Sequence, residues 1–249
     1  MGKQIASTLL PAEGINWSFS KLMMFEQCKL RFKMRYIDKV PEPPKVANNP
    51  MERGNRIHNH LEEFVGGIRP TLKGIEAKQI GAFEDNLNHL RGLYADGMAT
   101  TEDDWFFSNE WAVTDRANVW LWGKLDFLVL DEPNKTVVIG DYKSGKSGYK
   151  TMEHIQQLQL YSAITAIKYP WAERIWSELW YVDEGWIRQS ELSRERSLFY
   201  IGRFDARVQR IYSERFFPPS ANVHTCRFCP YGVNVGNGAC PSAVGVPKK

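Results

Sequence analysis

The sequence predicts an α/β protein with a mixed β-sheet flanked by helices. Helical patterns fill most of the first hundred residues, and three adjacent apolar segments with strand character follow them. The rest of the chain alternates a helix, a hairpin and a final helix. This order of elements favours a mixed sheet over an all-helical or all-strand fold.

Three helices are expected before the strands. The first covers residues 17–37, begins at Ser18 or Ser20 as the N-cap, and places basic residues opposite its apolar face. A proline-rich segment separates it from the second helix, residues 51–67, which stops at paired glycines. Residues 75–94 have near-helical apolar spacing and predict the third helix.

From Trp105 onward the chain reads as strands that alternate with helices. The expected elements are strands at 105–113, 118–130 and 135–143, a helix at 154–169, strands at 173–182 and 186–192, and a helix at 194–215. We expect one domain of residues 1–249. Its parts would be a helical N-terminal part (18–100), a core (105–215) and a cysteine-containing C-terminal segment (216–249) that packs with Cys28.

Composition excludes several classes of protein. A hydrophobic content of 43% and a charged content of 24% are those of a globular protein, not of a disordered chain. The formal net charge is only +3, so a nucleic-acid site would depend on local clusters of basic residues. No apolar run is long enough to span a membrane, and the first 17 residues lack a signal-peptide core, so we expect a cytoplasmic protein without membrane contact.

Two acids and a lysine mark the likeliest place for chemistry. Asp126 lies within the second expected strand, and Asp141 and Lys143 end the third. A hairpin between these strands would bring both carboxylates to one edge of the sheet. Carboxylate oxygens suit Mg²⁺ or Mn²⁺, and such an ion with a nearby lysine can activate water against a phosphodiester.

A competing motif overlaps the same residues. Residues 140–147 satisfy the phosphate-binding pattern GxxxxGK[ST] after an apolar strand, and the strand ending at Asp183 imitates its acidic partner. Against a P-loop NTPase, Asp141 would put a carboxylate among backbone N–H groups that should face phosphate. The following helix also begins only near Thr151.

Further motifs accompany the two acids and the lysine. They are Gly54-x-x-x-His58, Glu110 in the first expected strand, and Gln157-x-x-x-Tyr161 on the next helix. In this order the chain resembles the PD-(D/E)xK nucleases, specifically the branch with the RecB nuclease domain and the CRISPR-associated exonucleases. The resemblance implies a restriction-endonuclease-like core.

The resemblance also implies roles for these residues. His58, Asp126 and Asp141 would bind the catalytic Mg²⁺ or Mn²⁺, together with the carbonyl of Tyr142. Lys143 would orient or deprotonate the attacking water. Gln157 and Tyr161 would position that lysine or contact the nucleic acid, and Glu110 would be a supporting acid or a ligand of a second metal ion.

Four cysteines suggest a second metal site. Cys226 and Cys229 have a spacing suited to one metal ion or cluster, Cys240 follows a glycine-rich loop, and Cys28 lies alone near the start. His224 could complete a zinc site with the last three. The resembled branch uses one N-terminal and three C-terminal cysteines for a 4Fe-4S cluster, which would also account for Cys28.

The expected function is therefore a metal-dependent DNA exonuclease acting on single-stranded or end-exposed DNA in recombination, repair or phage replication. A helicase, a recombinase or a single-strand-binding protein would be its partner. One alternative is a non-catalytic DNA-binding or scaffold module in a helicase or integration complex, and the second is the P-loop NTPase.

Overall fold

The structure is a computed structural model that describes residue 12 and residues 14–44 and 49–245. The first 17 residues were expected to contain no signal-peptide core, and residues 1–11 of that segment lie outside the described residues. The chain divides into two compact units. The sheet unit is residues 46–203, and the cysteine unit combines residues 1–45 with 204–249, so the division falls within α6 (Arg194–Ser213).

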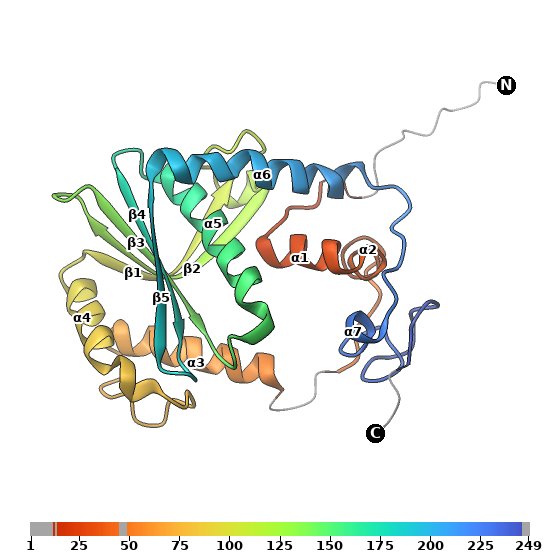
Figure 1. The fold of residues 1–249 in the computed structure, drawn as a ribbon, viewed down its shortest axis with the longest axis horizontal. Coiled ribbons are helices and arrows are strands. Elements are labelled where there is room, and N and C mark those ends of the chain that lie inside the picture. The colour runs from red at the N-terminus through yellow and green to blue at the C-terminus, as the bar shows by residue number, and fades with distance from the viewer. Residues whose placement is uncertain (1–11, 13, 45–48, 246–249) are drawn as a thin grey trace. The chain divides into compact units, whose positions relative to one another are not determined.

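Five strands form one sheet in the order β1-β2-β3-β4-β5 (Figure 1). They are β1 (Ala99–Phe107), β2 (Leu121–Asp131), β3 (Thr136–Lys143), β4 (Arg174–Tyr181) and β5 (Trp186–Ser193). The β3–β4 pair is parallel because α5 (Thr151–Lys168) connects these strands, and the other neighbouring pairs are antiparallel. The predicted mixed sheet flanked by helices is confirmed.

Helices α3 (Pro50–Val65) and α4 (Glu84–Ala95) cover one face of the sheet, and α5 covers the other (Figure 1). Apolar residues of α3 and α4 share a buried core with Phe127 of β2 and Tyr142 of β3. The next residue after Tyr142 turns its side chain to α5 instead, as alternation along a strand requires.

Strand β2 breaks this alternation at its centre. Gly123 faces α5, since a Cβ at this position would lie 2.9 Å from Cδ1 of Ile164. Phe127 lies four residues later, so regular alternation would place its side chain on the same face as Gly123. It packs instead in the core formed with α3 and α4. Opposite the break, Glu102 of β1 has a φ of 53° and is left out of the pairing register. The sheet is therefore irregular where Glu102 and Asp126 face each other.

Two predicted elements were misplaced in the sheet unit. The first strand was expected at 105–113, but β1 begins at Ala99 and ends at Phe107, because the polar segment TTEDD forms strand against its weak propensity. The helix expected at 75–94 is a 3₁₀ turn at Ile80–Phe83 followed by α4. Tertiary packing of Phe83 and Leu87 into the core decides where this helix lies.

The cysteine unit contains short helices and a long C-terminal segment. The single helix expected over 17–37 is interrupted: α1 is Phe19–Gln27, α2 is Lys29–Phe32, and a π-helical turn follows at Lys33–Ile37. Cys28 lies in the break with an extended backbone (φ −160°, ψ 108°). The C-terminal segment contains α7 (Val223–Cys226).

Aromatic packing joins the ends of the chain within the cysteine unit. The rings of Phe25 and Phe32 pack edge to face with centroids 5.5 Å apart, and Phe217 stacks on Phe32 at 6.4 Å. Lys29 pairs with Glu214 over 185 positions of sequence. No helix in the described part of the chain has both the length and the apolar character needed to cross a membrane.

Candidate metal centre

The two predicted acids lie where β2 and β3 separate. The antiparallel ladder of these strands ends at the pair Phe127 and Gly140, so Asp126 and Asp141 are the first residues beyond it. Gly140 is required there because a Cβ would lie 1.8 Å from Cζ of Phe127. The Phe127 ring therefore covers Gly140. We call the place where β2 and β3 separate beyond this pair, with Asp126 on one strand and Asp141 on the other, the strand fork.

Asp126 is buried and has two partners from different elements. Its Oδ1 lies 3.0 Å from Nδ1 of His58 on α3, and its Oδ2 accepts the backbone N–H of Tyr142 at 2.5 Å. The second bond satisfies an amide that the separating strands leave without a ladder partner. The carboxylate thus ties α3 to the end of β3.

These contacts set the charge of His58. Burial acts to lower the pKa of His58, but the charge of Asp126 and the hydrogen bond to it, together with the charge of Asp141, raise the pKa to about 9. The ring is therefore a cation at neutral pH in the absence of a metal ion. Metal binding by His58 would require the loss of this proton.

Asp141 is the most deeply buried acid of the fork, with 4% of its surface exposed. Burial raises its pKa, and the nearby charge of Lys143 opposes that shift. Its Oδ2 forms an ion pair with the Lys143 ammonium but accepts no hydrogen bond of ordinary geometry from the described residues. A buried carboxylate oxygen in this state retains a lone pair for a metal ion.

Lys143 is held in place by α5. Its Nζ donates to Oε1 of Gln157 at 2.7 Å, and Nε2 of Gln157 donates to the hydroxyl of Tyr161 at 2.9 Å. Gln157 and Tyr161 lie four residues apart, on one face of the helix. The structure therefore places both in contact with the lysine through one hydrogen-bonded chain.

Glu102 joins the site without having been predicted. Ligand atoms of His58, Glu102 and Asp126 all lie within 4.8 Å of one another. Glu102 also pairs with Lys124, and burial raises its pKa. Sequence reasoning missed it because β1 was placed too late; the acidic run at residues 102–104 was the available signal.

Glu110 does not lie in the first strand as predicted. It is exposed in the turn that follows β1, and it is not part of the group of possible ligands. The strand ends at Phe107 because the chain bends back, with the amide of Trp111 donating to the carbonyl of Ser108. The acid that β1 supplies to the site is Glu102.

The residues at the fork suit a divalent cation. Carboxylate oxygens are the ligands expected for Mg²⁺ or Mn²⁺, and an imidazole lies beside them. His58, Glu102 and Asp126 are the side chains that the structure gathers closely enough to share one ion, whereas Asp141, although it adjoins them, is not part of that group. Binding of the metal ion by the carbonyl of Tyr142 stays a prediction.

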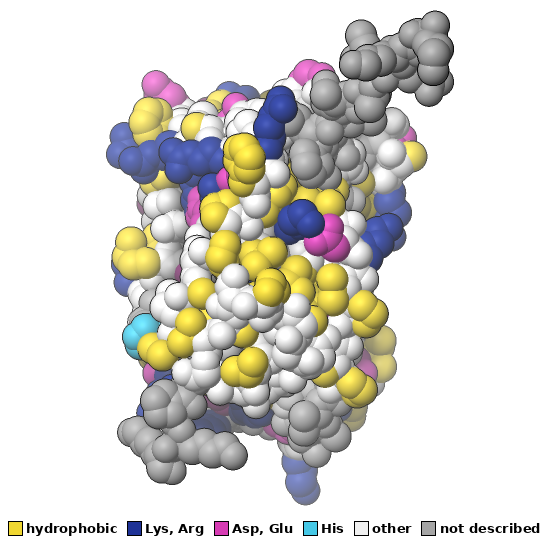
Figure 2. All heavy atoms as spheres, turned by 90° about the vertical axis from the view of Figure 1, so that its right-hand side faces the viewer, with side chains coloured by type: hydrophobic (Ala, Val, Ile, Leu, Met, Phe, Trp, Pro, Cys, Tyr) yellow, Lys and Arg dark blue, Asp and Glu magenta, His cyan; other side chains and the backbone are white. Residues whose placement is uncertain are grey.

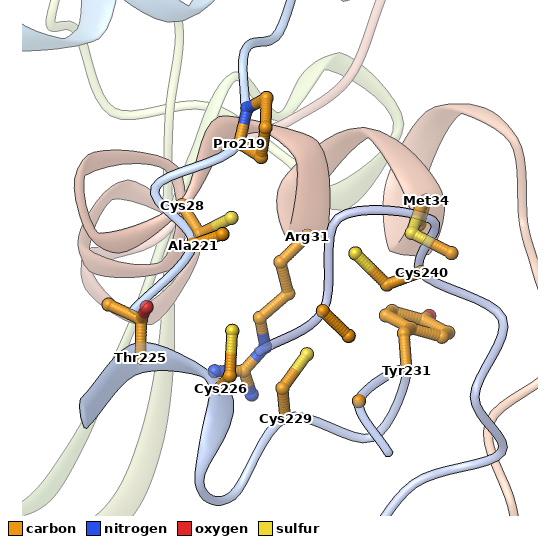
Figure 3. A pocket seen from close by; sticks show the side chains of 12 residues that line it. Cys28, Arg31, Met34, Pro219, Ala221, Thr225, Cys226, Cys229, Tyr231 and Cys240 are labelled. Carbon is orange, nitrogen blue, oxygen red and sulfur yellow. The ribbon is translucent and has the colours of Figure 1, made fainter. Parts of the chain in front are cut away.

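All four cysteines line one pocket of the cysteine unit (Figure 3). None of them is in a disulfide. The rest of the lining is mainly apolar but includes Arg31, whose buried Nε–H donates to no partner among the described residues. The structure thus brings Cys28, in the break between α1 and α2, to the three C-terminal cysteines.

The family model described as PD-(D/E)XK nuclease superfamily matches residues 16–233. This match covers most of the chain. The chain belongs to the PD-(D/E)XK nuclease superfamily.

Other comparisons add little to this membership. The crystal structure of SSO0001 matches with 16% sequence identity and a TM-score of 0.41, covering 94% of this chain and 89% of that chain. A search of the curated proteins gives no significant match.

The P-loop interpretation does not agree with the nuclease fold. Asp141 and Lys143 lie within β3, and no helix begins at Lys146: a 3₁₀ turn at Gly148–Lys150 leads into α5. Asp183, which would be the acidic residue of an NTPase, forms an ion pair with Arg53 instead. The segment is therefore a strand end and a connecting loop.

Proposed function

We propose that this member of the nuclease superfamily is a metal-dependent deoxyribonuclease that acts as an exonuclease on single-stranded or end-exposed DNA. The observation that carries the proposal is the buried fork, in which two carboxylates and a histidine converge beside a lysine held by Gln157. The exonuclease preference and the RecB-like branch depend on the order of the sequence motifs.

His58, Asp126 and Asp141, with the carbonyl of Tyr142, would bind Mg²⁺ or Mn²⁺, and Glu102 is the additional candidate ligand. The bound ion would polarise the phosphodiester and lower the pKa of the attacking water. Asp126 and Asp141 contribute negative charge that offsets the charge of the ion. Their burial reduces competition from bulk water.

Lys143 acts on the reacting atoms. Water oxygen forms a bond to phosphorus while the bond between phosphorus and the leaving oxygen breaks. The attacking water gives up a proton to solvent, and the leaving oxygen gains one from solvent. Because Gln157 fixes the ammonium of Lys143 next to Asp141, the lysine can orient the water and stabilise negative charge on the phosphate.

For the cysteine unit we propose a 4Fe-4S cluster bound by Cys28, Cys226, Cys229 and Cys240. A tetrahedral zinc site with bonds of about 2.3 Å holds its sulfurs about 3.8 Å apart. In the described residues, no three Cys or His ligand atoms of this unit gather within 4.8 Å of one another. His224 is exposed and does not line the pocket. This spread of thiols around one pocket favours a group larger than one ion.

Iron, sulfide and zinc analysis of the purified protein tests the cluster. We expect about four irons and four sulfides per chain, with broad absorbance in the near-ultraviolet and visible that Cys28→Ala removes. A colourless protein with one zinc per chain would contradict the cluster and support the zinc alternative.

A protein partner fits the surface of the cysteine unit. Hydrophobic side chains outnumber charged ones in the middle of the face that Figure 2 shows, at the right-hand side of Figure 1. Exposed apolar residues of this unit's C-terminal segment are Phe216, Val223, Phe228, Val233, Val235 and Val244. A helicase, a recombinase or a single-strand-binding protein is the proposed partner, in recombination, repair or phage replication. Four unpaired cysteines agree with a cytoplasmic location.

Cleavage of labelled oligonucleotides tests the proposed function. Strands blocked at the 5′ end, at the 3′ end or at both are incubated with Mn²⁺, with Mg²⁺ or with chelator. We expect metal-dependent cleavage that requires at least one free end, and its loss in Asp126→Ala.

The matched control is Lys135→Ala, which removes an exposed lysine just before β3. It should cleave like the parent. Equal cleavage by Asp126→Ala and the parent would contradict the proposed site. Cleavage of doubly blocked strands would make the enzyme an endonuclease, and DNA binding without cleavage in any metal would favour the scaffold alternative.

A further inference from the structure

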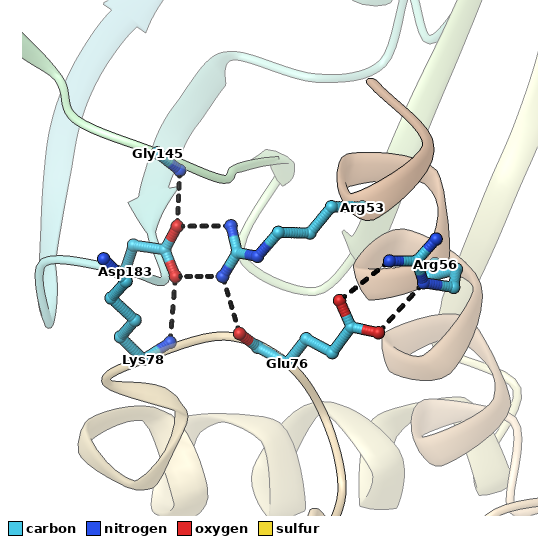
Figure 4. A network of polar contacts seen from close by, with 6 residues as sticks. All are labelled: Arg53, Arg56, Glu76, Lys78, Gly145 and Asp183. Carbon is cyan, nitrogen blue, oxygen red and sulfur yellow. Dashed lines mark hydrogen bonds and ion pairs between the residues drawn. The ribbon is translucent and has the colours of Figure 1, made fainter. Parts of the chain in front are cut away.

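One carboxylate of the sheet unit, with its side chain 6% exposed, joins three segments of the chain (Figure 4). Asp183, which follows β4, accepts four hydrogen bonds. Arg53 donates two of them through its guanidinium, each at 2.8 Å, and the backbone amides of Lys78 and Gly145 donate the others at 2.8 and 2.6 Å. The same guanidinium donates to the carbonyl of Glu76 at 2.6 Å.

Two of the segments bound by Asp183 adjoin elements of the fork. Arg53 lies on α3, five residues before His58. Gly145 lies two residues after Lys143 in the loop that leaves β3. The carbonyl of Lys143 in turn accepts the backbone N–H of Val182, the neighbour of Asp183.

The helix and the loop also touch directly. A Cβ at Gly54 would lie 3.2 Å from Oγ of Ser144, which is tighter than an ordinary contact. Gly54 therefore permits α3 to approach the residue next to Lys143. The glycine of the Gly-x-x-x-His motif and the arginine before it serve the same junction.

Burial separates this pair from the ion pair beside it. The Asp183 side chain is 6% exposed and that of Arg53 is 27% exposed. Arg56 and Glu76, also joined through two hydrogen bonds, are 37% and 40% exposed and do not contact the loop. A partly buried bidentate pair with its acceptors satisfied resists displacement better than an exposed pair.

We propose that Arg53 and Asp183 are positioning residues that fix His58 on α3 relative to Asp141 and Lys143 at the end of β3. This inference rests on the proposed nuclease function and assigns a role to the acid that imitates an NTPase residue. Neither residue would touch the DNA or the metal ion. Their loss would let the helix and the loop shift apart and would misplace ligands by a fraction of an ångström or more.

Two variants test the pair. Asp183→Asn removes the carboxylate charge at nearly constant shape, and Arg53→Lys keeps the positive charge but cannot form the two-bonded contact. We expect kcat to fall by about tenfold to a hundredfold in each, because small misplacements of reacting groups have effects of that size. KM for DNA should change little, and weaker Mn²⁺ binding should appear in calorimetry.

Glu76→Gln is the matched control. It breaks the exposed ion pair next to Arg53 but leaves the Glu76 carbonyl in place, so it should leave kcat and Mn²⁺ binding unchanged. Hydrogen exchange of the Gly145 amide should accelerate in Asp183→Asn and Arg53→Lys and not in the control.

The outcomes distinguish a positioning role from a purely structural one. Lower thermal stability with unchanged kcat and Mn²⁺ binding, measured well below the unfolding temperature, would overturn the proposal. If the parent protein cleaves no DNA, the proposed function fails, while Mn²⁺ binding and Gly145 exchange still decide whether the pair positions the centre. If Asp183→Asn does not fold, Arg53→Lys carries the test.

Discussion

The strand fork and the cysteine pocket are both suited to metal, but the chain prepares them in different ways. At the fork, His58, Asp126 and Lys143 each have a side-chain partner inside the protein. The pocket brings four free thiols together in a largely apolar lining. The fork should therefore form without its ion, whereas the cysteine unit should depend on what its thiols bind.

The largest effect is expected from the lysine of the fork. Lys143→Ala should reduce cleavage on the order of a thousandfold, since it removes the group proposed to orient water, with little change in the unfolding temperature. Single-turnover cleavage and thermal unfolding measure the two effects. A variant that loses its fold along with its activity would show that the fork is not preformed.

Loss of metal should separate the two regions. Chelation of the divalent ion should stop cleavage but leave the fold intact. Cys229→Ala should prevent binding of the proposed cluster and expose the cysteine unit to hydrogen exchange, because the four thiols come from distant segments of that unit. Equal exchange in Cys229→Ala and the parent would mean that the pocket, like the fork, is formed by the chain alone.

Packing beneath the fork gives the next prediction. Gly140→Ala should destabilise the protein by about 1–3 kcal/mol, because its methyl group displaces the ring of Phe127 next to Asp141. Gly92→Ala is the control: its Cβ meets nothing within 4 Å on α4, and it should stabilise by about 0.5–1 kcal/mol. Denaturant unfolding of both variants measures the difference, and a neutral Gly140→Ala would show that the fork tolerates movement.

The smallest effect concerns pH. Hydrogen bonds from Arg53, with those from the Lys78 and Gly145 amides, hold the pKa of Asp183 at about 2 in spite of its burial. Its contribution to stability, on the order of 2 kcal/mol, is complete above the ordinary pKa of an aspartate and is lost as pH falls through about 2. The stability difference between the parent and Asp183→Asn should therefore shrink between pH 4 and pH 2. A stability difference that stays constant over this pH range would mean that the substitution does not act through the charge of Asp183.

The sequence alone determined the mixed sheet and the residues nearest the fork. Asp141, Tyr142 and Lys143 are consecutive, and a short turn joins their strand to that of Asp126, so local pattern was enough to bring them together. Gln157 and Tyr161 follow on the next helix at one-turn spacing. These relations depend on strand and helix periods that any reader of the chain can apply.

The tertiary structure alone decided the rest. Glu102 reaches His58 and Asp126 because β1 includes a polar segment in which Glu102 is left out of the pairing register, and Glu110 lies outside because the chain bends back after Phe107. The bond between Arg53 and Asp183 joins residues 130 positions apart. The interruption of the first helix at Cys28 is likewise not visible in the local helical pattern. Local propensity cannot report these contacts, because their free energy comes from burial and pairing that exist only once distant segments have met.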